Sequence, residues 1–218
     1  IADSDFIIIT VPTPVNNKKE PDLIFLKNSC ETISPFIKKG SIIVFESTVY
    51  PGVVEGYCGK IIEKISKLKK NKDFFLGYSP ERINPGDKLR TLAKINKVVS
   101  GSNPFALNKI YSLYKKIITA KVFKAKSIKI AESAKVIENI QRDLNIGLMN
   151  ELYLLFKKTN INFNDILETA STKWNFVKFV PGLVGGHCIG VDPYYLTHFA
   201  KKNKFKSNLV LSARETND

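Results

Sequence analysis

Short apolar runs alternate with helix-like segments over the first 126 residues, and this alternation constrains the fold most strongly. Each apolar run is bounded by turn residues, which favours a buried strand over a helix. The runs cover residues 5–11, 41–46, 74–81, 97–101 and 121–125. Capping residues and periodicity predict helices between them, over residues 22–38, 51–69 and 104–116. The pattern predicts an α/β fold with a mostly parallel sheet that helices cover on both faces.

From residue 127 onward the sequence changes to one long amphipathic segment. Apolar residues recur there at helical spacing without a proline, and they are Val136, Ile137, Ile140, Leu144, Leu148, Leu152 and Leu155. This spacing predicts one helix over residues 127–158, about 45 Å long. Shorter helices are predicted near residues 163–170, 193–202 and 208–216. We therefore expect a sheet domain over residues 1–126 and an all-helical domain, built on the long helix, over 127–218.

The chain has 34 lysine and arginine residues against 20 acidic ones, a net charge of +14. A basic module that binds nucleic acid is therefore one alternative. However, only four of these residues are arginines, the side chain best suited to bidentate contacts with bases and phosphates. The lysines are scattered along the chain, so we interpret them as solvated surface residues whose field attracts anionic substrates. We expect no nucleic-acid partner.

Three cysteines, Cys30, Cys58 and Cys188, cannot all pair within the chain, and none has metal-ligand spacing. They indicate a reducing cytoplasm and give no reason to expect a metal site. The longest apolar stretch, residues 6–12, is far shorter than the ~18 residues that span a bilayer, so we expect no membrane anchor. The chain begins at Ile1 without a targeting leader, and we expect it to be part of a longer protein.

Cys188 lies in the motif G-G-H-C-I-G-V-D, among glycines that let a backbone approach a ligand closely. A lone cysteine is usually a small buried hydrophobe, but this setting favours a functional thiol. The adjacent His187 points to the opposite face in an extended segment, so it need not activate the thiol. Lys135 and Asn139 are four residues apart and share one face of the long helix. Spacing alone does not distinguish this pair from ordinary surface polarity.

Polar or turn residues follow each of the first three predicted strands. They are Pro12-Thr13-Pro14, Ser47-Thr48 and Glu81, and the carboxyl edge of an open α/β sheet is where ligands bind. The alternative is that loops after strands are simply polar. None of the twelve glycines forms a G-x-G-x-x-G motif, so the loop that cradles the diphosphate of a dinucleotide is missing from this chain.

Five motifs together resemble the nucleotide-sugar 6-dehydrogenases of the UDP-glucose and GDP-mannose dehydrogenase superfamily. They are VPTP at residues 11–14, ESTVYPG at 46–52, GYSPERINPGD at 77–87, AKVIENIQRDLNIGLMNE at 134–151 and PGLVGGHCIGVDPYYL at 181–196. Within it the chain looks most like the branch that oxidises UDP-N-acetylglucosamine or UDP-N-acetylgalactosamine for surface polysaccharide biosynthesis. The resemblance implies an NAD-dependent cytoplasmic oxidoreductase that carries out a four-electron oxidation of a UDP-sugar to its uronic acid.

The resemblance also implies an order of parts. Residues 1–126 would be the C-terminal part of an NAD-binding Rossmann-like domain, that is, the second half of its sheet. Residues 127–218 would be the central domain, which carries the catalytic cysteine loop and forms a homodimer through its long helix. Because the diphosphate-binding part is missing, we expect residues 1–218 alone to be inactive, and a non-catalytic dimerisation unit is an alternative.

Roles follow from the resemblance at the matching positions. Cys188 would capture the aldehyde as a thiohemiacetal and then carry the thioester. The other catalytic residues would be Lys135, Asn139, Asp192, Glu81 and Thr48. The nicotinamide side of NAD would be lined by Pro12, Thr13, Ser47 and Thr48. The substrate would contact Glu81, Arg82, Lys135, Asn139, Gly185 and Gly186.

Three departures from the UDP-glucose branch concern the identity of the sugar and a contact across the dimer. They are Pro85 in place of a second glutamate, Gly190-Val191 before the aspartate, and Lys173 or Trp174 near the position of a cross-subunit arginine. UDP-glucose and UDP-N-acetylmannosamine therefore remain as alternative substrates.

Overall fold

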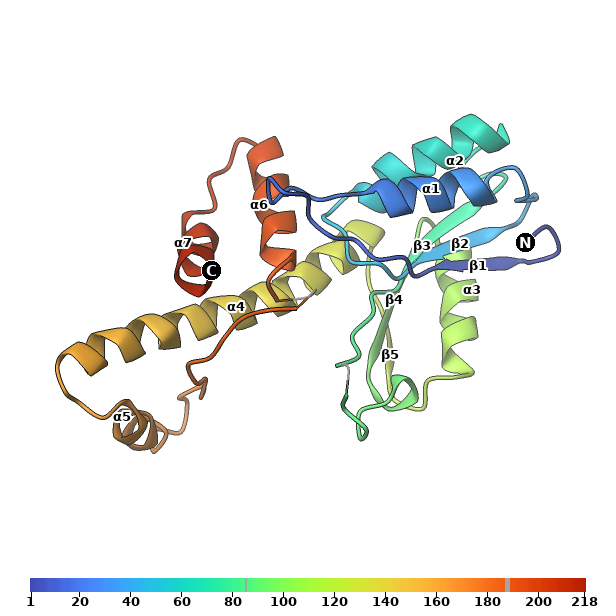
Figure 1. Ribbon diagram of the computed structural model, residues 1–218. Helices are drawn as coiled ribbons and strands as arrows, with labels where there is room; N and C mark the ends of the chain where they lie inside the picture. The colour runs from blue at the N-terminus through green and yellow to red at the C-terminus, as the bar shows by residue number, and fades with distance from the viewer. Residues whose placement is uncertain (85, 187–188) are drawn as a thin grey trace. The chain divides into compact units, whose positions relative to one another are not determined.

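The computed structural model describes residues 1–84, 86–186 and 189–218. The chain forms two compact units, Ile1–Val136 and Ile137–Asp218. The first unit contains a five-stranded sheet with strand order β1-β2-β3-β4-β5 (Figure 1). Its strands are β1 (Phe6–Ile9), β2 (Ile42–Phe45), β3 (Phe75–Tyr78), β4 (Lys97–Gly101) and β5 (Val122–Lys124). All five predicted strands are present, although four of them are shorter than predicted.

Three of the four strand pairings are parallel, which confirms the mostly parallel sheet. The exception is β3 with β4, an antiparallel pair in which Tyr78 lies opposite Ser100. A parallel neighbour needs a crossover that returns the chain to the starting end of the sheet. The connection from β3 to β4 carries only the short 3-10 helix η2 (Leu92–Lys94) among its described residues, so β4 runs back instead.

Helices cover both faces of this sheet, as the alternation predicted (Figure 1). α1 (Ile24–Ile33) and α2 (Gly59–Ser66) share one core with Ile43 and Phe45 of β2. α3 (Pro104–Lys115) packs on the other face, in a core with Ile42 and Val44. Successive side chains of a strand point to opposite faces of the sheet. Because both faces are covered by helices, all four residues of β2 are buried, which explains why the strand is hydrophobic throughout.

Two of the predicted helices differ from their expected limits. α1 ends at Ile33 rather than at residue 38, because Pro35 has no N–H to donate to the carbonyl four residues before it and its ring clashes with that carbonyl. The predicted helix at 51–69 divides into a π-helical segment, η1 (Val54–Cys58), and α2. α3 begins as expected, since the Asn103 side chain accepts a 2.8 Å hydrogen bond from the Ala106 N–H.

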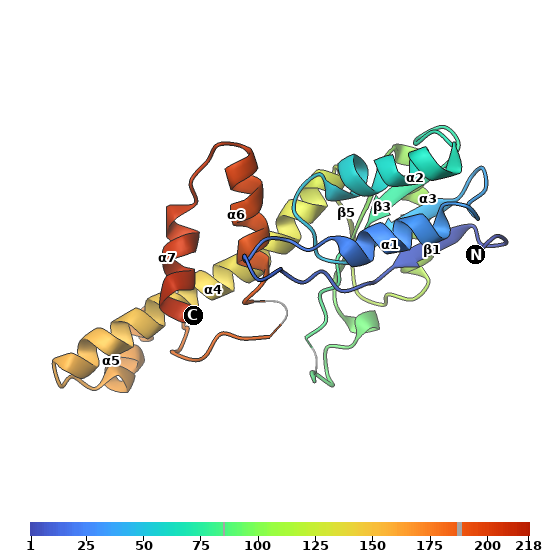
Figure 2. The same ribbon diagram turned by 45° about the horizontal axis from the view of Figure 1, so that its top comes forward.

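The second unit is helical. α4 (Ile128–Lys158) begins within the first unit and continues into the second, which also holds α5 (Phe163–Ala170), α6 (Asp192–Lys202) and α7 (Asn208–Asn217) (Figure 2). These limits agree with the predicted helices within one residue. Met149, Phe163 and Leu167 form the core between α4 and α5. α4 also packs closely on α7, since a Cβ on Gly147 would lie 3.4 Å from Cα of Ala213.

An ion pair inside the second unit joins α4 to α7. Arg214 Nη1 lies 2.6 Å from Oδ1 of Asp143, and both side chains are almost fully buried. Asn217 donates to the same carboxylate oxygen at 2.9 Å. Breaking such a pair leaves a charge buried without compensation, which is strongly destabilising. Helical spacing alone could not identify this pair, because its two residues are far apart in the chain.

Candidate functional site

The carboxyl ends of β1, β2 and β3 meet at one edge of the sheet, as the sequence predicted. Beyond the paired strands, the Ser47 hydroxyl donates a 2.6 Å hydrogen bond to the carbonyl of Val11. The Glu81 N–H donates to the carbonyl of Glu46 at 3.2 Å. The three segments that follow the strands therefore remain side by side in the loops, with the Ser47-Thr48 segment between the Pro12-Thr13 segment and Glu81.

The four residues expected to contact the cofactor differ in their exposure. Pro12 is exposed, while Thr13 and Thr48 are half-buried. Ser47 is buried, and its hydroxyl is engaged by Val11, so its contribution is to hold the two loops together. This edge therefore presents hydroxyl groups and a proline ring.

Glu81 is anchored by the backbone that follows it. Its Oε1 accepts hydrogen bonds from the N–H groups of Arg82 at 2.7 Å and Ile83 at 2.6 Å. The side chain is 42% exposed, so the carboxylate remains accessible from solvent. Arg82 donates from Nη1 to the carbonyl of Asn96 at 3.1 Å, which ties this loop to the start of β4.

Lys97 lies beside this edge and was not predicted as a site residue. Its side chain is fully buried, and its Nζ is 3.0 Å from Oε1 of Glu46. The Tyr114 hydroxyl donates to the same oxygen. Burial and the Glu46 charge raise the pKa of Tyr114, so the phenol stays protonated as a donor. The burial of Lys97 contradicts the interpretation of the lysines as surface residues. Residues two apart in a strand lie on the same face, so the position of Lys97 two residues before the apolar Val99 was the sequence signal for its burial.

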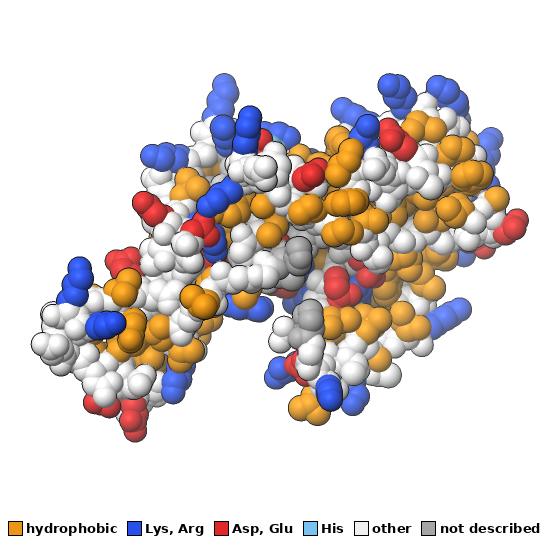
Figure 3. Space-filling model, in the orientation of Figure 1, with side chains coloured by type: hydrophobic (Ala, Val, Ile, Leu, Met, Phe, Trp, Pro, Cys, Tyr) orange, Lys and Arg blue, Asp and Glu red, His pale blue; other side chains and the backbone are white. Residues whose placement is uncertain are grey.

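Lys135 and Arg214 are buried as well, while most other lysines and arginines lie at the surface as the sequence indicated. Figure 3 shows their side chains scattered over the visible face rather than gathered in one patch. Within residues 1–84, 86–186 and 189–218, no helix is long and apolar enough to cross a bilayer. The same residues contain no group of three or more His, Cys, Asp or Glu side chains placed to hold a metal ion.

Glu132 attaches the loop after β2 to the first part of α4. Its carboxylate accepts hydrogen bonds from the N–H groups of Gly52 at 2.6 Å and Val54 at 2.9 Å. Burial raises the pKa of Glu132 to about 7, against the lowering effect of those two donors. Gly52 has a φ of +94°, a conformation that glycine adopts readily. Sequence reasoning missed this residue, since its partners are backbone groups.

α4 carries both Lys135 and Asn139, one turn apart, as predicted. Lys135 belongs to the first unit and is 7% exposed, so it is not an ordinary surface lysine. In the second unit, Asn139 Nδ2 donates a 2.5 Å hydrogen bond to Oδ2 of Asp192, the first residue of α6. Both of these side chains are buried. The structure therefore brings together two predicted catalytic residues that are far apart in the sequence.

The cysteine loop is described only in part. Cys188, the expected nucleophile, lies outside the described residues, as do His187 and Pro85. Gly186 has a φ of +80°, which favours glycine, whereas a Cβ on Gly185 would meet no atom within 4 Å.

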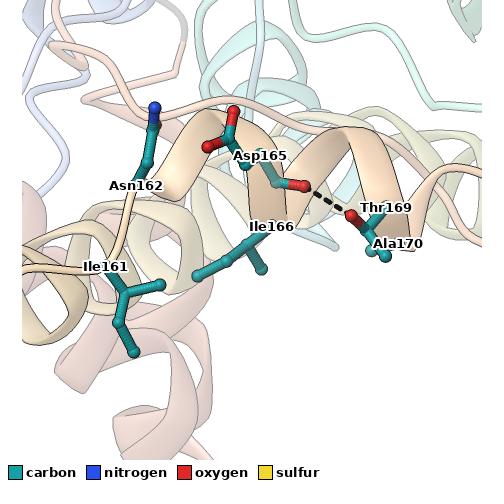
Figure 4. Close-up of a pocket in the computed structure, with 6 residues that line it drawn as sticks. All are labelled: Ile161, Asn162, Asp165, Ile166, Thr169 and Ala170. Atoms are coloured by element: carbon teal, nitrogen blue, oxygen red, sulfur yellow. Dashed lines mark hydrogen bonds between the residues drawn. The ribbon is translucent and has the colours of Figure 1, made fainter.

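A separate pocket of about 440 Å³ lies along α5 and contains none of the predicted site residues (Figure 4). It is lined by Ile161, Asn162, Asp165, Ile166, Thr169 and Ala170. The Thr169 hydroxyl is already engaged, because it donates to the carbonyl of Asp165 at 2.7 Å. This mainly apolar hollow offers no arrangement for catalysis.

Two sequence profiles cover almost the whole chain. The NAD binding domain of the UDP-glucose/GDP-mannose dehydrogenase family matches residues 1–118, and the central domain of that family matches residues 129–218. A UDP-N-acetyl-D-glucosamine 6-dehydrogenase from Pseudomonas aeruginosa is 55% identical over 97% of this chain and 50% of its own length. The Salmonella typhi protein of the same name is 51% identical over 100% and 51%.

A solved structure has the same fold. The UDP-D-ManNAc dehydrogenase from Pyrococcus horikoshii has a TM-score of 0.90 and 31% identity, with 99% of this chain and 50% of that one covered. The chain therefore spans about half the length of the relatives it matches.

Proposed function

The chain belongs to the UDP-glucose/GDP-mannose dehydrogenase family, and from that premise we propose that its protein oxidises the 6-hydroxymethyl group of a UDP-N-acetylhexosamine to the carboxylate, with NAD. The observation that carries the proposal is the buried hydrogen bond between Asn139 and Asp192. We propose that both residues are catalytic, as the resemblance of their motifs to the family implies, and they meet from different helices. A buried amide and carboxylate in contact form a pre-organised polar site beside which charge can develop.

The proposed chemistry passes through the thiol of Cys188. The alcohol first loses a hydride and a proton to become an aldehyde, and the sulfur then adds to the aldehyde carbon to give a thiohemiacetal. Loss of a second hydride and proton gives a thioester, which water hydrolyses to the carboxylate and the free thiol. Covalent capture suits this sequence because it retains the aldehyde and converts it into a species that can lose hydride.

Other residues stabilise charge and move protons in this proposal. Lys135 places a cation beside each developing oxyanion, and Asn139 assists by hydrogen bonding. Asp192 orients Asn139 through their contact. Glu81 and Thr48, at the sheet edge, handle protons of the attacking water. Arg82, Gly185 and Gly186 are proposed to contact the substrate.

The residues at the sheet edge fit the nicotinamide half of NAD. Thr13 and Thr48 offer hydroxyl groups that suit a ribose and a carboxamide, and Pro12 offers an apolar surface for a ring. Ser47 supports them by joining the two loops. NAD would supply a hydride acceptor at this place. The diphosphate would need a glycine-rich loop that leads into a helix N-terminus, and the printed sequence contains no G-x-G-x-x-G motif for such a loop.

We further propose that the protein is a homodimer through α4. Ile137, Leu148 and Leu155 are 57%, 51% and 52% exposed. Their separations of 11 and 7 residues place them on one face of the helix. Large apolar side chains exposed together on one helix face are typical of an interface.

We place the protein in the cytoplasm. Cys30 and Cys58 are free thiols in the core of the first unit, which is consistent with a reducing compartment.

The substrate assignment is supported by the relatives. Those at 51% and 55% identity are named for UDP-N-acetyl-D-glucosamine, whereas the UDP-N-acetyl-D-mannosamine dehydrogenases from Methanocaldococcus jannaschii and Pyrococcus horikoshii are 34% and 31% identical. The test is to supply the complete protein with NAD and a panel of UDP-sugars, and to identify products by mass. We expect UDP-N-acetylglucosamine or its galacto epimer to give a uronic acid and two NADH. Oxidation of UDP-glucose or UDP-N-acetylmannosamine alone would overturn the substrate assignment, and no NADH with any sugar would overturn the activity.

A further inference from the structure

Lys97 is a buried cation placed between two carboxylates at the ends of β2 and β3. Its Nζ is 3.0 Å from Oε1 of Glu46 and 3.9 Å from Oε2 of Glu81. The same atom donates a 3.3 Å hydrogen bond to the carbonyl of Pro80. An ammonium without exposed surface has lost its hydration, and an apolar residue of similar volume is often at least as stabilising in such a place. Packing alone therefore gives no reason for a lysine here.

Glu46 is the nearer of the two carboxylates to the ammonium of Lys97, and its contacts leave the ammonium within reach of Glu81. Oε1 of Glu46 accepts from both Lys97 and the Tyr114 hydroxyl. The Tyr114 ring also contacts the cation, with its centroid 5.3 Å from Nζ. Together with Pro80, these contacts fix the ammonium at the sheet edge, where it faces the second carboxylate.

Glu81 is the partner that the ammonium can orient. Its Oε1 is held by the N–H groups of Arg82 and Ile83, while its Oε2 is the oxygen nearest to Lys97. The backbone fixes one oxygen, and the buried cation attracts the other. The carboxyl group thus has a defined plane although much of it is exposed to water.

We propose that Lys97 is a positioning residue that orients Glu81 for hydrolysis of the thioester. It acts through Glu81 without touching the substrate, and the inference rests on the proposed function. In that step water adds to the thioester carbon, Glu81 accepts the proton that water loses, and the sulfur of Cys188 leaves as thiolate. A carboxylate that is misplaced by even about 1 Å can slow such a step ~100-fold.

The test is a double-mutant cycle on kcat in the complete protein, with NAD and the sugar that it oxidises. Lys97→Met should lower kcat about 10- to 100-fold, while the KM for NAD and for the sugar changes less than about threefold. Lys97→Arg, which keeps the charge, should recover most of the loss. In a Glu81→Gln background, Lys97→Met should cause no further loss. Lys121→Met, an exposed lysine just before β5, is the matched control.

The following results would overturn the role proposed for Lys97. Unchanged kcat in Lys97→Met, additive losses with Glu81→Gln, or no recovery with Lys97→Arg would overturn the proposal. If thermal unfolding indicates that Lys97→Met is not folded, Lys97→Gln replaces it, since glutamine keeps a donor without the charge and should show the same loss. If neither variant folds, Lys97 is a structural residue and the proposal is wrong. Wild-type protein that reduces no NAD would contradict the proposed function instead, before any variant is compared.

Discussion

The carboxylate of Glu132 lies 2.6 Å from the backbone nitrogen of Gly52, so one buried side chain of α4 holds the loop that carries Ser47 and Thr48. Burial raises the pKa of Glu132 to about 7 from its ordinary 4.5. The folded state therefore binds more protons than the unfolded state between these values. By linkage, the free energy of unfolding falls as the pH rises through this window.

The first prediction is that Glu132→Gln removes this part of the pH dependence. At about 1.4 kcal/mol per unit of pKa shift, the wild type should lose about 3 kcal/mol between pH ~4.5 and ~7 relative to the variant. Urea titrations across this range measure the difference. The exposed Glu168, changed to Gln, is the control and should keep the wild-type slope. Parallel curves for wild type and Glu132→Gln would mean that Glu132 titrates normally.

Hydrophobic patterning identified the helices and strands of this fold, but individual residues such as proline determine where some of them end. Lys97–Gly101 and Phe163–Ala170 occur as predicted because their periodicity and boundaries agree. The predicted end of α1 was wrong because apolar residues continue past Pro35, where the missing N–H and the ring of proline end the helix.

The candidate site was predictable where a motif or a strand end marked it, as at Glu81 and Asn139. Lys97 and Glu132 were missed for a common reason. A charged residue is buried only when partners remove the cost of desolvation. Their partners, Glu46 and the N–H groups of Gly52 and Val54, come from distant parts of the chain. Residue type alone therefore indicated surface positions.

The second prediction concerns Lys135. In the complete protein, Lys135→Ala should lower kcat about 100- to 1000-fold, because it removes the cation beside each oxyanion. Initial rates of NADH formation measure the loss. Lys157→Ala, at the exposed end of the same helix, should behave as wild type. An equal effect of both substitutions would indicate damage to α4 rather than to catalysis.

The third prediction is that Leu148→Lys with Leu155→Lys makes the complete protein monomeric, because two ammonium groups would be buried in the proposed interface. Light scattering measures the mass in solution. Phe36→Lys introduces the same side chain at an exposed apolar residue of the first unit and should leave a dimer. A wild-type protein that is itself monomeric would contradict the α4 interface.

The fourth prediction is that residues 1–218 alone reduce no detectable NAD with any UDP-sugar. The sheet edge can contact the nicotinamide half, but no glycine-rich loop in this chain holds the diphosphate. Absorbance of NADH in the presence of excess sugar measures turnover. Turnover at a rate near that of the complete protein would mean that NAD binds elsewhere.

The last prediction separates the three cysteines by their chemistry. Cys188→Ala in the complete protein should abolish formation of the uronic acid while substrate still binds, because the thiol acts after the alcohol has docked. Cys188→Ser should accumulate an aldehyde-level or ester adduct, since an alkoxide is a poorer leaving group than a thiolate. Cys30 and Cys58 are buried in the core of the first unit, so their alanine variants should be less stable but should still form the uronic acid. Product mass under identical NAD and substrate provides the comparison: a Cys188→Ala protein that still makes uronic acid near the wild-type rate would exclude the thioester route, whatever the other two variants do.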